Sequence, residues 1–447
     1  MTVHVLKNAS LNLVNDNITI CMETFSEYTK SKRCSIRESA ERQYTLFPKS
    51  KTALKNMIKD EITKQGPEAD LNHIDVSRIT DFSKLFEKST FNGNISRWDV
   101  SNATNMSSMF GESEFNGDIS GWDVSNVTNM SDMFCGCGSF DQDLSGWDVS
   151  NVKDMRWMFG RCEAFDQDLS GWDVSNVANM CSMFYGAINF NGDVSTWDVR
   201  NVKNMSFMFF RCDLFNGNLK RWNTKNVTDM SCMFKSAESF NQDISRWDVS
   251  NVRNMADMFY NAKSFNQDVS KWDVSKVTDM SYMFRGAESF NQDLSGWDVS
   301  NMKTCSNMFY YAKSFNRDIS TWDTSNVTDM SGMFAYSSFN GDLKSWNTKN
   351  VSNMNSMFFE CKSFNQDISK WNVSNVIDMN FMFAHCKAFN QDISKWNVSK
   401  AIYMSYMFYD ALSFNQDLSG WNVSKVKRKE NMFDGCPCPK ECQPKFK

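Results

Sequence analysis

Residues 265–289 decide the fold and read FNQDVSKWDVSKVTDMSYMFRGAES. Variants of this stretch fill the chain after residue 70, spaced by 25 residues and by 24 at three steps. Ile74 takes the tryptophan position of one degenerate copy before the others. The tryptophans that mark the copies are Trp98, Trp122, Trp147, Trp172, Trp197, Trp222, Trp247, Trp272, Trp297, Trp322, Trp346, Trp371, Trp396 and Trp421. A fixed period of this size predicts a solenoid, in which each unit contacts mainly its neighbours.

The apolar pattern changes period within each copy. Residues 272–274 alternate apolar, polar and apolar, which is the spacing of a strand. In residues 277–284 the apolar side chains fall at i, i+3, i+6 and i+7, which is one face of a short helix. All five prolines lie outside the repeats, as expected where backbone N–H groups are committed to ladders. The sequence therefore predicts an α/β solenoid with one short parallel strand and one short helix per turn. About 15 turns at about 4.8 Å each would give a rod roughly 70 Å long.

The chain divides into four parts. Residues 1–47 carry no repeat and form a poorly determined leader, and residues 48–70 form an N-terminal cap. The solenoid itself covers residues 71–433, and residues 434–447 are a tail rich in cysteine, proline and lysine.

The cap is predicted to be one amphipathic helix over residues 52–65. Leu54, Ile58 and Ile62 follow helical spacing, and Gly66 with the next proline ends the helix. Such a helix can cover the open end of a solenoid, whose first turn would otherwise expose its core.

The overall charge and hydropathy exclude several classes of partner. The net charge of −5 argues against a nucleic-acid-binding surface, and no run of about 18 apolar residues predicts a membrane span. The N-terminal stretch MTVHVLKNASLNLVNDNITI lacks the basic leader and apolar core of a signal peptide. This composition favours a cytoplasmic start.

Five cysteines share one position, three residues after the Met-Phe pair, where other turns have alanine. They are Cys137, Cys162, Cys212, Cys361 and Cys386. A position that accepts either Ala or Cys is small and buried, which favours reduced core thiols. Bridges between adjacent turns stay open as an alternative for Cys137/Cys162 and Cys361/Cys386, because neighbouring strands lie within disulfide reach.

The tail contains Cys436, Cys438 and Cys442 within seven residues. Three thiols could bind zinc, but no fourth cysteine or histidine lies nearby. A metal site and a local disulfide are alternatives to a disordered tail, which the sequence favours.

Repeated residues become columns in a solenoid. One column is acidic in twelve of fourteen turns: Asp118, Asp143, Asp168, Asp193, Asp243, Asp268, Asp293, Asp318, Asp342, Asp367, Asp392 and Asp417. Such residues commonly accept backbone N–H groups in turns, and this interpretation is preferred to a calcium ladder. A column of identical acids offers no contrast between proton donor and acceptor, so it predicts no catalysis. The tryptophan and methionine columns are predicted to be core.

Three positions near the Met-Phe pair vary between turns and are often aromatic: the residue between Ser and the second Met, and the two residues after the pair. Examples are Trp157, Phe207, Phe210, Tyr260, Tyr282, Tyr310, Tyr311, Phe359, Phe381, Tyr406 and Tyr409. They lie off the Val/Met/Met/Phe face, which predicts an outward stripe. Such side chains could anchor a partner protein or lie flat on neighbouring turns, and the sequence does not choose between the two.

No residue pattern in the chain predicts catalysis. It contains three histidines, of which only His73 and His385 lie near the repeats, and no phosphate-binding loop. An active site would have to lie in residues 1–47. The prediction is a non-enzymatic protein without cofactor or metal.

The phrase FNQDISxWDVSNVTDMSxMF resembles the 25-residue repeat of BspA-like leucine-rich-repeat surface proteins, also found in mycoplasma-type surface lipoproteins. The likeness covers about residues 71–433. It implies a leucine-rich-repeat-like solenoid that binds protein or mediates adhesion at the cell surface, with a host or extracellular-matrix protein as the type of partner. It implies no catalytic residue. The cytoplasmic start keeps an intracellular scaffold as the alternative.

Overall fold

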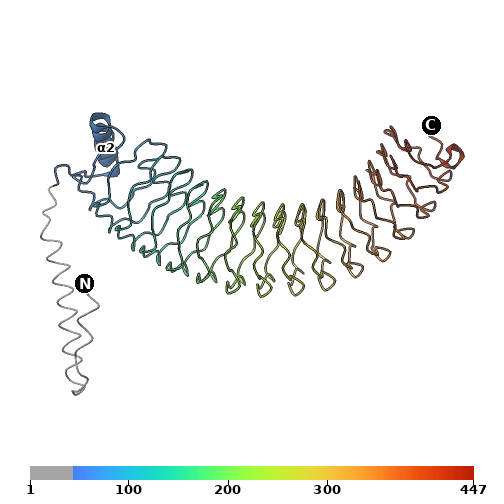
Figure 1. Cartoon of the computed structure of the whole chain (residues 1–447), viewed down its shortest axis with the longest axis horizontal. Helices are drawn as coiled ribbons and strands as arrows, with labels where there is room; N and C mark the ends of the chain where they lie inside the picture. Colours follow the sequence, from blue (N-terminus) through green and yellow to red (C-terminus); the bar gives the residue numbers. More distant parts are fainter. Residues whose placement is uncertain (1–43, 447) are drawn as a thin grey trace, which may run out of the picture.

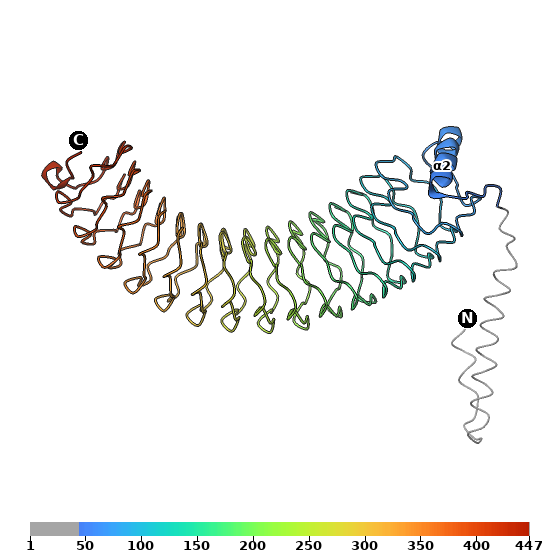
Figure 2. The ribbon, with the colours of Figure 1, turned by 180° about the vertical axis from the view of Figure 1, so that it is seen from behind.

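The computed structural model describes residues 44–446, which form an arc of stacked turns with the two ends at its tips (Figures 1 and 2). Within these residues the helices are α2, Lys51–Gln65, and the short 3-10 helix η1, Lys440–Cys442. The predicted repeat solenoid is confirmed. The predicted strand and helix of each turn are wrong, because the described repeats contain neither. The leader prediction for residues 1–47 lies mostly outside the described residues.

A hydrogen-bonded ladder takes the place of strand and helix. In residues 280–286 every second N–H donates to a carbonyl of the next turn, as from Tyr282 to Ser306 at 2.9 Å. The intervening N–H groups close tight turns within the copy, as from Met283 to Met280 at 3.2 Å. Each turn is therefore bonded to its neighbour along the stack direction and folded tightly on itself.

Left-handed backbone conformations explain why no helix forms. Tyr282 and Gly286 have φ of 60° and 66°, and the same two positions are left-handed in the other described turns. An α-helix needs negative φ at every residue, so it cannot pass through these positions. Parallel pairing is reduced to a single bridge per turn, as between Asp279 and Thr304. The apolar spacing of residues 277–284 fits this alternating backbone as well as it fits a helix.

The core consists of stacked ring columns. The tryptophans of the repeat column, from Trp98 to Trp421, are 2–5% exposed, and each of their indole N–H groups donates to a carbonyl of the preceding turn, as from Trp272 to Ile244 at 3.2 Å. Phe259 and Phe284, from the Met-Phe pairs of adjacent turns, stack at 5.6 Å. The predicted burial of the tryptophan and methionine columns is confirmed.

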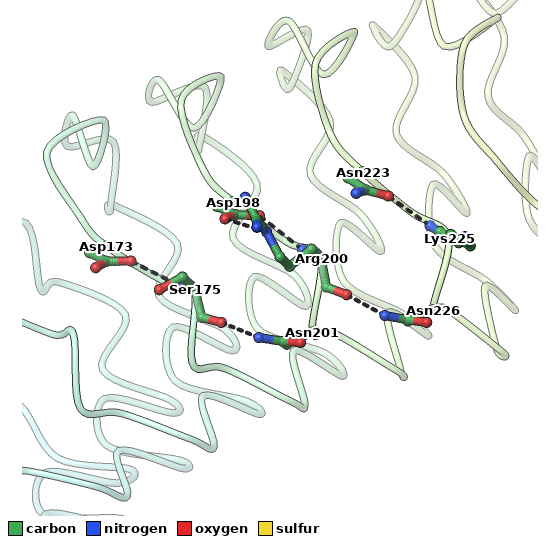
Figure 3. A network of polar contacts seen from close by, with 8 residues as sticks. All are labelled: Asp173, Ser175, Asp198, Arg200, Asn201, Asn223, Lys225 and Asn226. Carbon is green, nitrogen blue, oxygen red and sulfur yellow. Dashed lines mark hydrogen bonds and ion pairs between the residues drawn. The ribbon is translucent and has the colours of Figure 1, made fainter.

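Polar side chains close the turns on the surface (Figure 3). Asp173 Oδ1 accepts the N–H of Ser175 at 2.9 Å, and Asn201 Nδ2 donates to the carbonyl of Ser175 at 2.7 Å. The acidic column behaves in the same way, as where Asp293 accepts the N–H of Ser295 at 2.9 Å. The predicted turn-capping role of this column is confirmed.

The helix α2 lies at the N-terminal end of the stack. Ser50 caps it by accepting the N–H of Ala53 at 3.2 Å, and Gly66 follows its last residue. Leu54 and Ile58 are buried in the hydrophobic core, so the helix covers the first turn.

The C-terminal tail is ordered, and the prediction of a disordered tail is wrong. Cys438 is 4% exposed, and Cys442 lies in η1 with its carbonyl accepting the N–H of Leu418 at 2.7 Å. Cys436 packs partly buried against the core. The tail thus continues the path of a repeat for most of another turn.

The five repeat cysteines are buried and free in the structure. Neither Cys137/Cys162 nor Cys361/Cys386 is bridged. The Cys162 thiol instead donates to the carbonyl of Phe134 at 2.9 Å. Burial raises the pKa of Cys137 to about 11, so this thiol stays protonated at neutral pH.

The arc has a defined inner side. Equivalent rings of adjacent turns are 4.4 Å apart for Tyr185 and Phe210, 5.6 Å for the core phenylalanines, and 6.4 Å for Trp247 and Trp272. Equivalent points lie closer together on the inside of an arc. The ladder and the side chains outside it therefore face the concave side, and the tryptophans lie toward the convex side. The predicted rod is curved into an arc (Figures 1 and 2).

Candidate functional site

The strongest candidate for a site is a row of rings on the concave side. We call it the aromatic stripe and define it as the aromatic residues at the three variable positions beside the ladder. Its members are Trp157, Tyr185, Phe207, Phe210, Tyr260, Tyr282, Tyr310, Tyr311, Tyr336, Phe359, Phe381, His385, Tyr406 and Tyr409. It spans eleven successive turns, of which all but the turn of Met233 carry at least one ring.

Contacts between turns connect the rings at both ends of the stripe. Tyr185 stacks on Phe210 at 4.4 Å, and Phe381 stacks on Tyr406 at 4.8 Å. Tyr336 packs edge-on against Phe359 at 5.1 Å. The side chains therefore lie against neighbouring turns, yet they remain half-buried or exposed. Each ring rests on its neighbours and presents its remaining surface to solvent.

Cations occupy the middle of the stripe. Lys235 Nζ lies 4.3 Å from the ring centre of Tyr260. The Arg285 guanidinium lies 5.1 Å from the ring of Tyr260 and 4.3 Å from that of Tyr310. Lys235 also forms an ion pair with Asp257 at 2.7 Å. Such cation–π contacts hold long side chains over the rings and give the centre of the stripe a polar and an apolar component.

Eight stripe residues adopt a backbone conformation that disfavours bulky side chains. Their φ values lie between 56° and 60°. They are Trp157, Phe207, Tyr282, Tyr311, Tyr336, Phe381, His385 and Tyr406. Glycine occupies the same positions in other turns, as at Gly286 and Gly332. The fold therefore does not require rings there, and each ring is kept at a conformational cost of about 1–2 kcal/mol.

The structure brings together all the residues predicted from the aromatic pattern, from Trp157 to Tyr409. Sequence reasoning missed Tyr185, Tyr336 and His385, and the cations Lys235 and Arg285. The repeat register could have identified them, because all five occupy the three variable positions beside the Met-Phe pair. His385 lies 5.2 Å from Tyr409 ring to ring and pairs with Asp410 at 3.5 Å.

A surface hollow lies beside the C-terminal half of the stripe. Its lining residues are Glu360, Lys362, His385, Lys387, Asp410 and Leu412. Leu412 is 54% exposed, so the hollow combines an apolar side chain with charges of both signs. The hollow adjoins the stripe at His385 and adds to the surface that a partner could contact.

Among residues 44–446, no group of three or more His, Cys, Asp or Glu side chains is placed to hold a metal ion. The helices within this range are all too short or too polar to cross a bilayer.

Solved structures with some likeness to the chain come from several kinds of protein. A TLR13–ssRNA13 complex is 12% identical with a TM-score of 0.23, covering 84% of this chain and 53% of that one. The functional domain of InlJ from Listeria monocytogenes, which includes a cysteine ladder, is 8% identical with a TM-score of 0.20, covering 74% and 60%. The plant peptide hormone receptor RGFR1 in complex with RGF2 is 9% identical with a TM-score of 0.16, covering 79% and 78%. The chain thus spans about half the length of the first of these proteins. No curated protein matches the chain.

The repeats themselves match a family model. The matches cover residues 52–172, 153–266, 240–341 and 335–443, so they extend over nearly all of the described residues. The chain belongs to the family described as "Mycoplasma protein of unknown function, DUF285".

Proposed function

We propose that the protein is a non-enzymatic binding module that holds a partner protein along the aromatic stripe. The observation that carries this proposal is the row of half-buried or exposed rings, eight of which are kept at left-handed positions where glycine also fits. Aromatic side chains and arginine are the residues that most often anchor protein interfaces. Rings braced against neighbouring turns lose little side-chain entropy on binding, which favours affinity.

A triple substitution at the centre of the stripe tests this function. Tyr260→Ser, Tyr282→Ser and Tyr310→Ser together remove the rings around Arg285. The full chain, immobilised, first captures a partner from an extract, and the affinity of the purified partner is then measured for both forms. We expect a loss of at least about 100-fold, because each anchor typically contributes 1–2 kcal/mol or more.

A matched control removes three exposed apolar side chains that lie outside the stripe. Leu214→Ser, Ile377→Ser and Tyr403→Ser change residues that are 53%, 42% and 37% exposed. This variant should bind with unchanged affinity. Equal binding by the stripe variant, with its fold intact by circular dichroism, would remove the stripe as the binding surface.

The proposed binding module could act at the cell surface as an adhesin or inside the cell as a scaffold, and its location distinguishes the two. The resemblance to BspA-like surface proteins favours an adhesin, and an intracellular scaffold that binds its partner along the arc is the alternative. Protease treatment of intact cells should remove an adhesin from immunoblots and leave a scaffold untouched.

A further inference from the structure

The last turn of the ladder differs from all the others. Residues 429–435 keep the ladder conformation, with φ of 53° at Asn431 and 71° at Gly435. Their carbonyls bind the preceding turn, as where Glu430 accepts the N–H of Tyr406 at 2.8 Å. The turn is therefore complete on the side that faces the stack.

On its other side the last turn presents unpaired donors. The N–H groups of Lys429, Asn431, Phe433 and Gly435 correspond to those that join each earlier turn to the next, and none donates a hydrogen bond within residues 44–446. The carbonyls of Lys429, Asn431 and Phe433 accept N–H groups within the turn at 3.0–3.3 Å. At residues 429–435 the exposed edge therefore presents free backbone N–H donors, while these three carbonyls already accept hydrogen bonds within the turn.

A donor-only edge selects its ligand by chemistry. An ordinary β-strand presents N–H and C=O groups alternately, so its own N–H groups would stay unpaired here. Carboxylate groups carry acceptors only, and successive N–H groups in alternating right- and left-handed conformations form concave anion sites. In every earlier turn the carbonyls of the next turn fill these sites.

The charges around the edge favour the same ligand. Lys427 and Arg428 precede the donor row and are exposed. Lys429 is exposed with its Nζ 4.5 Å from the ring of Phe446. Of the two acids in the row, Glu430 turns back to accept the hydroxyl of Ser405, and Asp434 is exposed. The cations therefore outnumber the free carboxylate.

We propose that the C-terminal edge of the ladder, residues 427–435, binds an acidic peptide segment. Its carboxylates accept from the four free N–H groups, and Lys427 and Arg428 hold its excess charge. This site is separate from the aromatic stripe and does not depend on the function proposed for the stripe.

The test uses the full chain and a fluorescently labelled octaglutamate peptide, with binding followed by anisotropy. Lys427→Gln with Arg428→Gln should weaken binding about tenfold, which corresponds to about 1.4 kcal/mol. Lys370→Gln with Lys395→Gln removes the same charge from exposed positions of two inner turns and should leave the affinity unchanged. An equal loss in both variants would show a general charge effect and overturn the site.

Hydrogen exchange tests the backbone donors themselves. Octaglutamate should slow exchange of the amides in residues 429–435 and leave residues 404–410 of the preceding turn unchanged, since those are already bonded. The Tyr260, Tyr282 and Tyr310 triple variant should bind octaglutamate like the unmodified chain. Absence of protection at residues 429–435, or displacement of the peptide by equimolar inorganic phosphate, would overturn an acidic peptide as the ligand.

Discussion

At the scale of the single residue, the chain repeats a few local solutions with little variation. Tryptophan in one turn donates its indole N–H to the backbone of the turn before, as from Trp297 to Val269 at 3.0 Å. Aspartate caps the next bend through its carboxylate, as Asp268 does for Ser270. These roles were predictable from residue type and alternation, because a buried indole needs an acceptor and aspartate favours turns. The left-handed positions were not. Glycine, asparagine and aspartate, which favour positive φ, occupy some of them, but serine, tyrosine and arginine in other turns obscure this preference.

Substitution by glycine at one left-handed position tests the cost assigned to it. Ser108 has φ of 52°, and Gly332 shows that the position accepts glycine. Ser108→Gly should raise the free energy of local opening by about 0.5–1 kcal/mol, measured by hydrogen exchange of the amides at 106–112. The neighbouring change Ser107→Gly lies outside the left-handed positions and should lower it by a similar amount. If the free energy of local opening fell in both variants, the left-handed position of Ser108 would not be strained.

At the scale of the element, apolar spacing alone predicted a helix in each repeat that the structure does not contain. The i, i+3, i+6, i+7 pattern of residues 277–284 occurs in helices, yet here it describes overlapping tight turns joined to the next copy. Left-handed residues interrupt any helix, and hydrogen bonds between copies replace those within an element. The spacing of α2 predicted its helix well, because Lys51–Gln65 lies outside the repeats and is not bonded to a neighbouring turn through a backbone ladder.

The helix α2 should stabilise the first turn and little else. Leu54 is fully buried, so Leu54→Ala should cost about 2–5 kcal/mol in local stability. Hydrogen exchange should quicken in residues 71–90 and stay unchanged in residues 280–286, since each turn contacts mainly its neighbours. Lys55→Ala, at an exposed position of the same helix, is the control and should change neither region. Uniform loss of protection along the chain would contradict local capping.

At the scale of the whole molecule, repetition multiplies small effects. The arc follows from unequal spacing, since rings of adjacent turns lie 5.7 Å apart for Phe284 and Phe309 and 6.4 Å apart for Trp297 and Trp322. The sequence predicted that like residues would stack into columns, and the structure confirms this. It could not predict the curvature, which depends on the difference in spacing between columns.

The acidic column should make the stack sensitive to acid. Hydrogen bonds from the backbone and hydroxyl of the following serine lower the pKa of Asp118, Asp268 and Asp293 in the folded state. Their stabilising contribution is therefore complete above the unfolded pKa of about 3.9, and it is lost as the pH falls through the lower folded value. The urea midpoint should stay constant from about pH 7 to 5 and drop below about pH 4.

An asparagine variant isolates the contribution of the column. Asp268→Asn with Asp293→Asn keeps an acceptor oxygen, as Asn94 and Asn218 do at the same position. Its midpoint should depend less on pH between about 4 and 2.5. A pH dependence equal to that of the unmodified chain would assign the acid sensitivity to other groups.

The ladder gives the molecule an electrical direction. Four backbone N–H groups per turn donate toward the C-terminal end, and one or two, as at Thr278 and Ser289, donate to the preceding turn. Peptide dipoles aligned in this way add along the stack, as they do in an α-helix, whereas the alternating dipoles of ordinary sheets nearly cancel. The arc should therefore behave as a macroscopic dipole with its positive pole at the C-terminal tip, and it should orient measurably in an applied electric field.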